Sequence, residues 1–222
     1  LMFLFSVGGT TYGMGEETVG FYILLAATMM AAGFDPLVGA ATVALLGELG
    51  FNRMSLGVQD FDETVQKAVN RIQSEDETFA VIDAARANGF KSISVDLIYG
   101  SPTSNFEIWK DNLSKTIELQ VPHVSSYALT VEPKTALEKW IENGKVSSPQ
   151  EAEQNQEFYY MKDFLKDNGF DHYEISNFGK PGFHSKHNSA YWKYKEYLGI
   201  GPSAHSYNGR NQRSWNVANN TK

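Results

Sequence analysis

Polar side chains alternate with apolar ones along two segments of this chain, and their types suit the binding of a polar ligand. Arg53 and Gln59 lie on the polar side of the first segment, and Asp96 lies on the polar side of the second. A buried aspartate without a partner is energetically costly. We therefore expect this face to line a cavity that holds a polar ligand. The alternative is an open sheet in which Asp96 forms a structural ion pair with Arg53 or Arg71.

A second group combines histidine with amide and aromatic side chains at short spacing. His187, Asn188, Tyr191 and Trp192 follow one another closely. Histidine is a reasonable axial ligand for heme iron, and aromatic rings can pack against a porphyrin face. The alternative is a structural turn in which Tyr191 and Trp192 belong to the core. His184 and His187 have a spacing that would suit a divalent metal on a helix, but no acidic third ligand is nearby.

Composition excludes several kinds of chemistry. The chain has 222 residues, a formal net charge of −7 and no cysteine, so it can form no disulfide, thiolate metal site or cysteine nucleophile. The acidic balance, without any cluster of Lys and Arg, argues against nucleic acid as a partner. A phosphate-binding loop of the GxxxxGK type is absent from the sequence. A protein without disulfides fits the cytosol.

Three predicted strands have to position the polar face. The ranges 53–59 and 92–98 alternate polar and apolar residues with the period of a strand, and a third strand is predicted over 123–131. Helical patterns lie between them, so strands and helices alternate along the chain. This alternation is typical of an α/β fold with a parallel sheet and right-handed crossovers.

Start and stop signals predict where the helices lie. Ser74 and Ser104 are each followed three residues later by a glutamate, which predicts a capping box at the start of two helices. Pro149 is predicted to occupy the first position of a third helix, where its fixed φ angle is suitable. The pair Asn168-Gly169 is predicted to end that helix.

Seven short strings occur in a characteristic order: NRMSLGVQDFD, VNRIQS, VDLIYGSP, SSYALTVEPKTAL, HYEISNF, KHNSAYW and YLGIGPSAHS. Over residues 50–222 this order resembles the radical-SAM family of HemW-type heme chaperones and HemN-type oxygen-independent coproporphyrinogen III dehydrogenases. The resemblance implies a partial radical-SAM (β/α) barrel with parallel strands, followed by a mixed α+β C-terminal region. An N-terminal apolar helical segment is expected before the barrel.

The resemblance also implies a pocket for S-adenosylmethionine. By position, its residues are Gln59, Arg71, Asp96, Ile98 and Thr130. Carboxylate and amide groups can hold the ribose hydroxyls and the amine of this ligand, and an arginine can pair with its carboxylate. The alternative for Arg71 is a solvated helix residue, and the alternative for Gln59 is a cap at the end of a strand.

Heme and an iron–sulfur cluster are the other cofactors that the resemblance implies. Heme is associated with the HNxxYW element, here His187, Asn188, Tyr191 and Trp192, with His187 as the candidate iron ligand. A CxxxCxxC loop holds the [4Fe–4S] cluster in the family, near its N-terminus. Because this chain has no cysteine, we predict that it binds no cluster and performs no radical catalysis by itself.

Residues 1–48 differ in composition from the rest, since they contain no Lys or Arg. They resemble a segment of membrane carriers of the YfcC type, so we expect a chimera, and a piece of a longer protein, with a junction near residue 48. Their uncharged runs fit either a pair of buried helices or a broken membrane segment. The expected domains are a carrier-like segment (1–48), a partial barrel (49–145) and a HemW-like C-terminal region (146–222).

The favoured function is that of a heme-binding, chaperone-like protein that passes heme to a respiratory acceptor. The alternatives are an oxygen-independent coproporphyrinogen III dehydrogenase of porphyrin biosynthesis and a fragment of a membrane carrier. The expected partners are heme or a porphyrin and the heme-accepting protein, without nucleic acid. We expect a cytoplasmic location, with membrane contact through residues 1–50 as the alternative.

Overall fold

The computed structural model describes residues 43, 45–68 and 72–218. The described chain forms two compact units, one that ends at Phe183 and one that begins at His184. The first unit holds a five-stranded sheet and the second holds a two-stranded sheet. Arg71 and nearly all of the carrier-like segment 1–48 lie outside the described residues, so what was expected of them stays a prediction.

The sheet of the first unit contains three parallel strands in sequential order, followed by two short antiparallel strands. Their order is β1 (Arg53–Gln59), β2 (Ser92–Tyr99), β3 (His123–Ala128), β5 (Asn177–Gly179) and β4 (Asp171–His172). The alternation that predicted the first three strands is confirmed. The third strand ends at Ala128, earlier than its predicted limit of 131, although the Leu129 N–H still donates to Tyr99 O of β2 at 2.8 Å.

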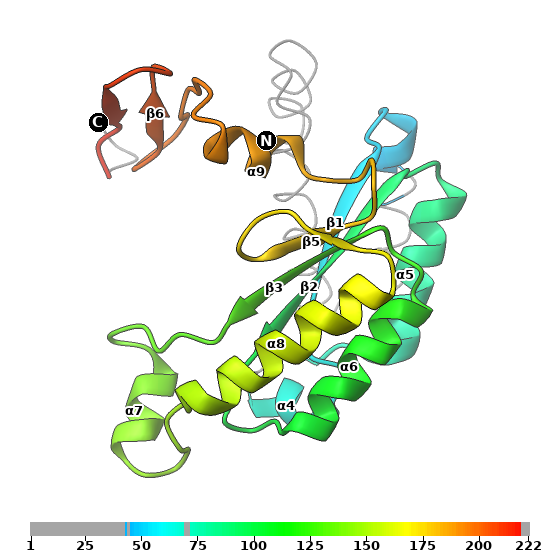
Figure 1. The fold of residues 1–222 in the computed structure, drawn as a ribbon, viewed down its shortest axis with the longest axis vertical. Coiled ribbons are helices and arrows are strands. Elements are labelled where there is room, and N and C mark those ends of the chain that lie inside the picture. Colours follow the sequence, from blue (N-terminus) through cyan, green and yellow to red (C-terminus); the bar gives the residue numbers. More distant parts are fainter. Residues whose placement is uncertain (1–42, 44, 69–71, 219–222) are drawn as a thin grey trace. The chain divides into compact units, whose positions relative to one another are not determined.

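Helices connect the strands of this sheet (Figure 1). They are α4 (Glu63–Ala68), α5 (Glu75–Ala87), α6 (Phe106–Glu118), α7 (Ala136–Glu142) and α8 (Glu151–Asp167). The first two lie between β1 and β2, the third lies between β2 and β3, and the last two follow β3. The predicted alternation of strand and helix is therefore confirmed over this part of the chain.

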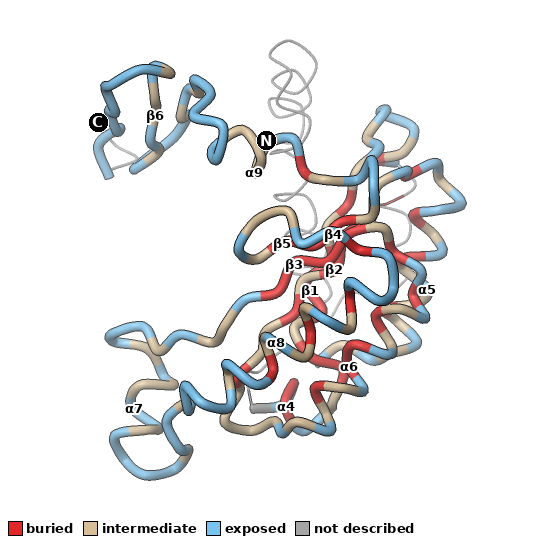
Figure 2. The backbone as a smooth tube through the Cα atoms, in the orientation of Figure 1, coloured by how far each residue is buried: buried red, intermediate tan, exposed pale blue. Residues whose placement is uncertain are grey.

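One face of the sheet is apolar and packs against helices α5, α6 and α8. Met54, Val95 and Phe178 from the strands belong to the same buried core as Trp109 of α6 and Leu165 of α8. Figure 2 shows this buried material along the strands and on the inner sides of the helices. Right-handed crossovers between sequential parallel strands place their helices on one face, as in a barrel. The expected partial barrel of α/β class is thus confirmed.

The helix caps differ in part from the predicted ones. The capping box at Ser74 is confirmed, with the Ser74 side chain accepting from the Glu77 N–H and the Glu77 carboxylate accepting in return. The predicted cap at Ser104 is wrong: Asn105 caps α6, and its Oδ1 accepts from the N–H groups of Glu107 and Ile108, both at 3.0 Å. The Ser104 N–H donates to Ser101 O in a preceding turn, which delays the helix by one residue.

The start of α8 also differs from its prediction. Gln150 is the N-cap, with an extended backbone, and the helix begins at Glu151. Pro149 therefore precedes the cap and does not occupy the first helical position. The predicted end is confirmed, because Asn168 is the C-cap.

The second unit is small and mostly exposed. It contains α9 (Lys186–Trp192), which has no buried residue, and an antiparallel pair of strands, β6 (His205–Tyr207) and β7 (Arg213–Trp215). Among the residues that the structure describes, no helix combines the length and the apolar character needed to cross a membrane. The predicted domain limit at residue 145 stays a prediction.

Candidate functional site

The face of the sheet opposite the core helices carries hydrophilic side chains from neighbouring strands. Strand register pairs Ser94 of β2 with His123 of β3, and pairs Asp96 with Ser125. Ser125 in turn pairs with Asn177 of β5. Residues at matching register positions point to the same face of a sheet. These side chains therefore form a continuous polar face across β2, β3 and β5.

Asp96 has a defined partner on this face. The Ser55 hydroxyl donates to its carboxylate, at 2.9 Å from Oδ1 and 3.1 Å from Oδ2. Arg53 donates to Ser92 Oγ at 3.3 Å. The Ser55 hydroxyl on the adjacent strand β1 thus stabilises the half-buried carboxylate of Asp96.

A buried histidine links the polar face to the loop before β5. His123 is 1% exposed, and its Nδ1 lies 2.7 Å from Ser94 Oγ while its Nε2 lies 2.7 Å from the Tyr173 hydroxyl. Nearby, Ser125 Oγ donates to Asn177 Oδ1 at 2.7 Å, and Asn177 donates to the Glu174 carboxylate. His123 was not predicted as a site residue from the sequence, although its alternation with Ser125 along β3 was a usable signal.

The pKa of Tyr127 is affected by the charged side chains near the polar face. Burial raises the pKa of its hydroxyl, the carboxylates of Asp96 and Glu174 act in the same direction, and the hydrogen bond with Ser125 acts in the opposite direction. The carboxylates of Asp96 and Glu174 therefore place negative charge near Tyr127, which favours cationic or hydroxyl-bearing groups there.

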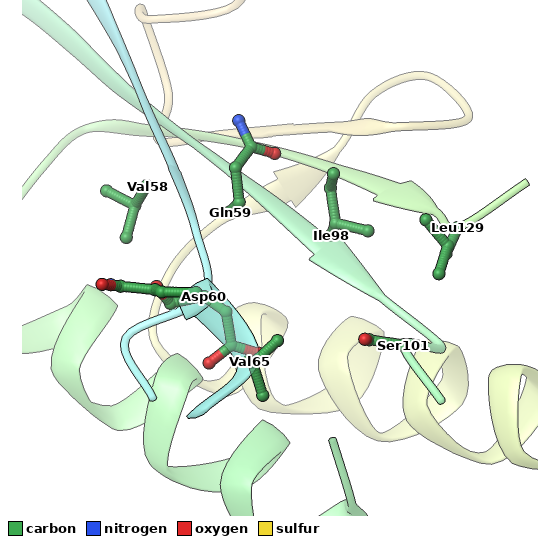
Figure 3. Close-up of a pocket in the computed structure, with 8 residues that line it drawn as sticks. Val58, Gln59, Asp60, Val65, Ile98, Ser101 and Leu129 are labelled. Atoms are coloured by element: carbon green, nitrogen blue, oxygen red, sulfur yellow. The ribbon is translucent and has the colours of Figure 1, made fainter. Parts of the chain in front are cut away.

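A cavity of about 220 Å³ lies where the three parallel strands end. Figure 3 shows that Gln59, Ile98 and Leu129 come from the ends of neighbouring strands. Gln59 has a φ of 68° at a register shift in β1. This left-handed conformation is uncommon for a residue with a side chain, and such residues gather at functional sites.

Asp60 is the buried carboxylate of this cavity. It is 3% exposed, and burial raises its pKa from 3.8 to about 6, although the Asp62 N–H and the nearby Asn112 amide act in the opposite direction. Its Oδ1 accepts from the Asp62 N–H at 2.7 Å, whereas its Oδ2 makes no hydrogen bond to a described residue. Such an unsatisfied buried oxygen is rare in a folded protein.

Of the residues predicted for the S-adenosylmethionine pocket, some line the strand-end cavity and others do not. Gln59 and Ile98 both line the strand-end cavity. Asp96 belongs to the adjoining polar face, two residues before Ile98 on β2. Thr130 is exposed beyond the end of β3, where its hydroxyl lies 3.5 Å from a Glu132 carboxylate oxygen.

The predicted heme residues lie together on α9. The rings of His187 and Tyr191 meet edge to face with 4.8 Å between their centroids, and Tyr191 contacts Tyr197 in the same way at 4.9 Å. Tyr191 and Trp192 are 44% and 55% exposed, so the alternative that places them in a core is wrong. The structure, over its described residues, contains no group of three potential metal-binding side chains that would include His184.

The residues present do not fit an iron–sulfur cluster. Thiolates are the ordinary ligands of such clusters, and the sequence of this chain contains no cysteine. The polar face and the strand-end cavity contain amide, carboxyl and hydroxyl groups instead. These groups fit a polar organic ligand.

Comparisons with known proteins place these features in context. Residues 24–115 match the radical SAM superfamily, and the match begins inside the segment 1–48. The chain is 38% identical over 165 residues to the heme chaperone HemW of Lactococcus lactis, which covers 74% of this chain and 44% of that protein. It is 33% identical over 172 residues to the heme chaperone HemW of Bacillus subtilis. This match covers 78% of the present chain and 45% of the Bacillus protein.

A solved structure shows the same arrangement of elements. It is the coproporphyrinogen III oxidase HemN of Escherichia coli, described as a radical SAM enzyme, with a TM-score of 0.67 and 28% identity. The match covers 81% of this chain and 44% of that protein. The chain therefore spans less than half the length of the relatives that it matches.

Proposed function

Because this chain belongs to the HemW- and HemN-like family of radical-SAM proteins, we propose that it is a heme-binding, chaperone-like protein that passes heme to an acceptor. The name of the curated relatives, heme chaperone, supports this function. A respiratory protein is the proposed acceptor. A chain without disulfides fits a cytoplasmic location.

The observation that carries the proposal is the pairing of His187 and Tyr191 on one side of α9. The two residues are four positions apart, so their side chains share a helix face. A histidine nitrogen can bind heme iron, and an exposed aromatic ring beside it can pack against the porphyrin. Ser185 caps the helix by accepting from the Asn188 N–H at 3.2 Å, which fixes the turn that presents His187.

A hemin titration tests this proposal. We expect the Soret band of hemin to shift on binding to the chain, and we expect His187→Ala to lose that shift or to weaken binding about tenfold or more, or about 1.4 kcal/mol. His205→Ala is the matched control, because His205 is an exposed histidine of the same unit that packs against Trp215. A spectrum in His187→Ala that equals the wild-type spectrum would remove His187 as the ligand.

We further propose that the strand-end cavity and the polar face hold S-adenosylmethionine. Gln59 and Ile98 would line the ligand, Asp96 would accept from its hydroxyls or amine, and Arg71 and Thr130 would complete the pocket. In a protein that also holds a reduced cluster, this ligand supplies radical chemistry. This chain contributes no thiolate to a cluster, so its own residues would bind and orient the ligand without catalysis.

One observation favours a second function. The solved structure that shares this fold is a coproporphyrinogen III oxidase, so oxidative decarboxylation of coproporphyrinogen III is the alternative. The lack of cysteine opposes it. The carrier alternative and membrane contact of residues 1–50 depend on a segment that lies almost wholly outside the described residues.

A further inference from the structure

Two polar side chains of α8 reach from the helix to the backbone at the ends of neighbouring strands. Gly100, which follows β2, donates its N–H to Glu157 Oε2 at 2.6 Å. Gln154 donates from its Nε2 to the carbonyl oxygen of Leu129, which follows β3, at 2.9 Å. Gln154 and Glu157 are three positions apart, so their side chains lie on the same face of the helix. This face of α8 therefore binds the loops after both strands.

The ends of these two strands also contact each other, and their loops reach the strand-end cavity. The Leu129 N–H donates to Tyr99 O of β2 at 2.8 Å. Ser101 and Leu129 come from the two loops and line the strand-end cavity, whereas Gln154 and Glu157 do not line it. Any effect of α8 on a ligand in that cavity would therefore act through the loops.

The turn at Gly100 leaves no room for a side chain. Gly100 has a φ of +75°, a left-handed conformation that residues with a side chain rarely adopt. A Cβ atom at this position would also overlap the Gln154 side chain. The loop after β2 thus approaches α8 more closely than a residue with a side chain would allow, and this close contact defines where the loop lies.

The Glu157 carboxylate is a costly group to keep in this place. The residue is 6% exposed, and burial raises the pKa of its carboxyl. The hydrogen bond from the Gly100 N–H lowers this pKa, while the charges of Glu153 and Asp60 raise it further. An apolar side chain of similar length would avoid the desolvation cost. We therefore attribute the carboxylate to the placement of the loop after β2 and not to the stability of the core.

We propose that Gln154 and Glu157 are positioning residues, which hold the loops after β2 and β3 in the arrangement that lets a ligand occupy the strand-end cavity. The inference rests on the proposed function, because the ligand proposed for that cavity is S-adenosylmethionine. Each side chain acts through the backbone of one loop, Glu157 through Gly100 and Gln154 through Leu129.

Substitution by methionine, which is unbranched and of similar length, tests the two contacts. The affinity of the full 222-residue chain for S-adenosylmethionine is measured by calorimetric titration, and the free energy of unfolding is measured with urea. We expect Gln154→Met and Glu157→Met each to weaken binding about fivefold, because one loop loses its hydrogen bond to α8. Glu157→Gln should retain most of the affinity, since its amide oxygen can still accept from the Gly100 N–H.

The stability of Glu157→Met distinguishes positioning from a purely structural role. Its free energy of unfolding should change little, because removal of a buried carboxylate offsets the Gly100 N–H that is left unpaired. Ile82, which is 1% exposed in the core, provides the reverse case. Ile82→Val should lower the free energy of unfolding without changing the affinity.

Gln156→Met is the matched control for the substitution itself, because Gln156 is exposed on the same helix. It should change neither the affinity nor the stability. Amide hydrogen exchange over residues 98–104 and 128–132 gives a second readout. Exchange should be faster in the loop after β2 for Glu157→Met, faster in the loop after β3 for Gln154→Met, and unchanged for Gln156→Met.

Wild-type affinity in both Gln154→Met and Glu157→Met would overturn the inference. An equal loss of affinity in Ile82→Val would also overturn it, because the effect would then follow from stability alone. If the wild type binds S-adenosylmethionine and the α8 variants bind it equally well, only this inference fails. If the wild type does not bind S-adenosylmethionine, the proposed pocket fails and the inference fails with it, whereas the hemin titration tests the function of His187 separately.

Discussion

At the scale of single residues, the most informative carboxylate is that of Asp60, which was not predicted from the sequence although its neighbour Gln59 was. Gln59 was predicted to bind a ligand, and it does line the strand-end cavity. The next residue, Asp60, is the one that is buried with an unsatisfied oxygen. Its raised pKa, about 6, makes the stability of the fold depend on pH in the weakly acidic range.

We predict that Asp60→Asn removes this pH dependence. Because the folded state raises the Asp60 pKa from 3.8 to about 6, its stabilising contribution is complete below pH 4 and is lost as pH rises to 6. Stability should therefore fall by up to about 3 kcal/mol over that interval in the wild type relative to the variant. Urea unfolding between pH 4 and pH 8 measures the difference. Parallel curves for both proteins would show that Asp60 does not titrate in this way.

At the scale of elements, local hydrogen bonds decide where each helix begins. The sequence rule for a capping box fits Ser74 and Ser104 equally well. Ser74 is the N-cap of α5 and has an extended backbone, whereas at the start of α6 the N-cap with an extended backbone is Asn105. The side chain of Asn105 accepts two N–H groups of the first turn, so it replaces the cap expected one residue earlier.

We predict that Asn105→Ala destabilises the protein by about 1 kcal/mol, because the N–H groups of Glu107 and Ile108 lose their acceptor. Ser104→Ala, which tests the cap expected from sequence, should change the free energy of unfolding by less than about 0.5 kcal/mol. Thermal or urea unfolding of the two variants provides the comparison. Equal losses would mean that Ser104 contributes to the cap as well.

At the scale of the whole molecule, core helices on one face leave the other face of the sheet for ligand chemistry. The apolar side of β1 and β2 packs against α5, α6 and α8, and the opposite side carries Asp96 and His123. A doubly wound sheet would cover both faces with helices. The single-sided arrangement is the reason why the alternating strands of this chain keep a polar side.

We predict that the chain assembles no iron–sulfur cluster after anaerobic reconstitution with iron and sulfide. The reason is chemical, since 222 residues without cysteine offer no thiolate ligand. Iron and acid-labile sulfide are measured after desalting, together with the visible absorption spectrum. Stoichiometric iron with a [4Fe–4S] spectrum would contradict the prediction and would require ligands of another type.

The sequence by itself determined the alternation of strands and helices, the apolar side of each strand and the absence of thiolate chemistry. These properties follow from the period of side chains along a strand and from composition, which are local or additive. Gln59 and Asp96 could be named as candidates because they lie on the polar side of a strand, whereas Ile98 was named only because of the resemblance to the family.

Only the tertiary structure decided which groups meet. Ser55 and Asp96 are 41 positions apart, and strand register brings them within hydrogen-bonding distance. The burial of Asp60 depends equally on segments that are distant in sequence, since the Phe61 N–H beside it donates to Asn112 Oδ1 of α6. Burial and contact are properties of packing between elements, and the period of a single segment carries no information about its neighbours.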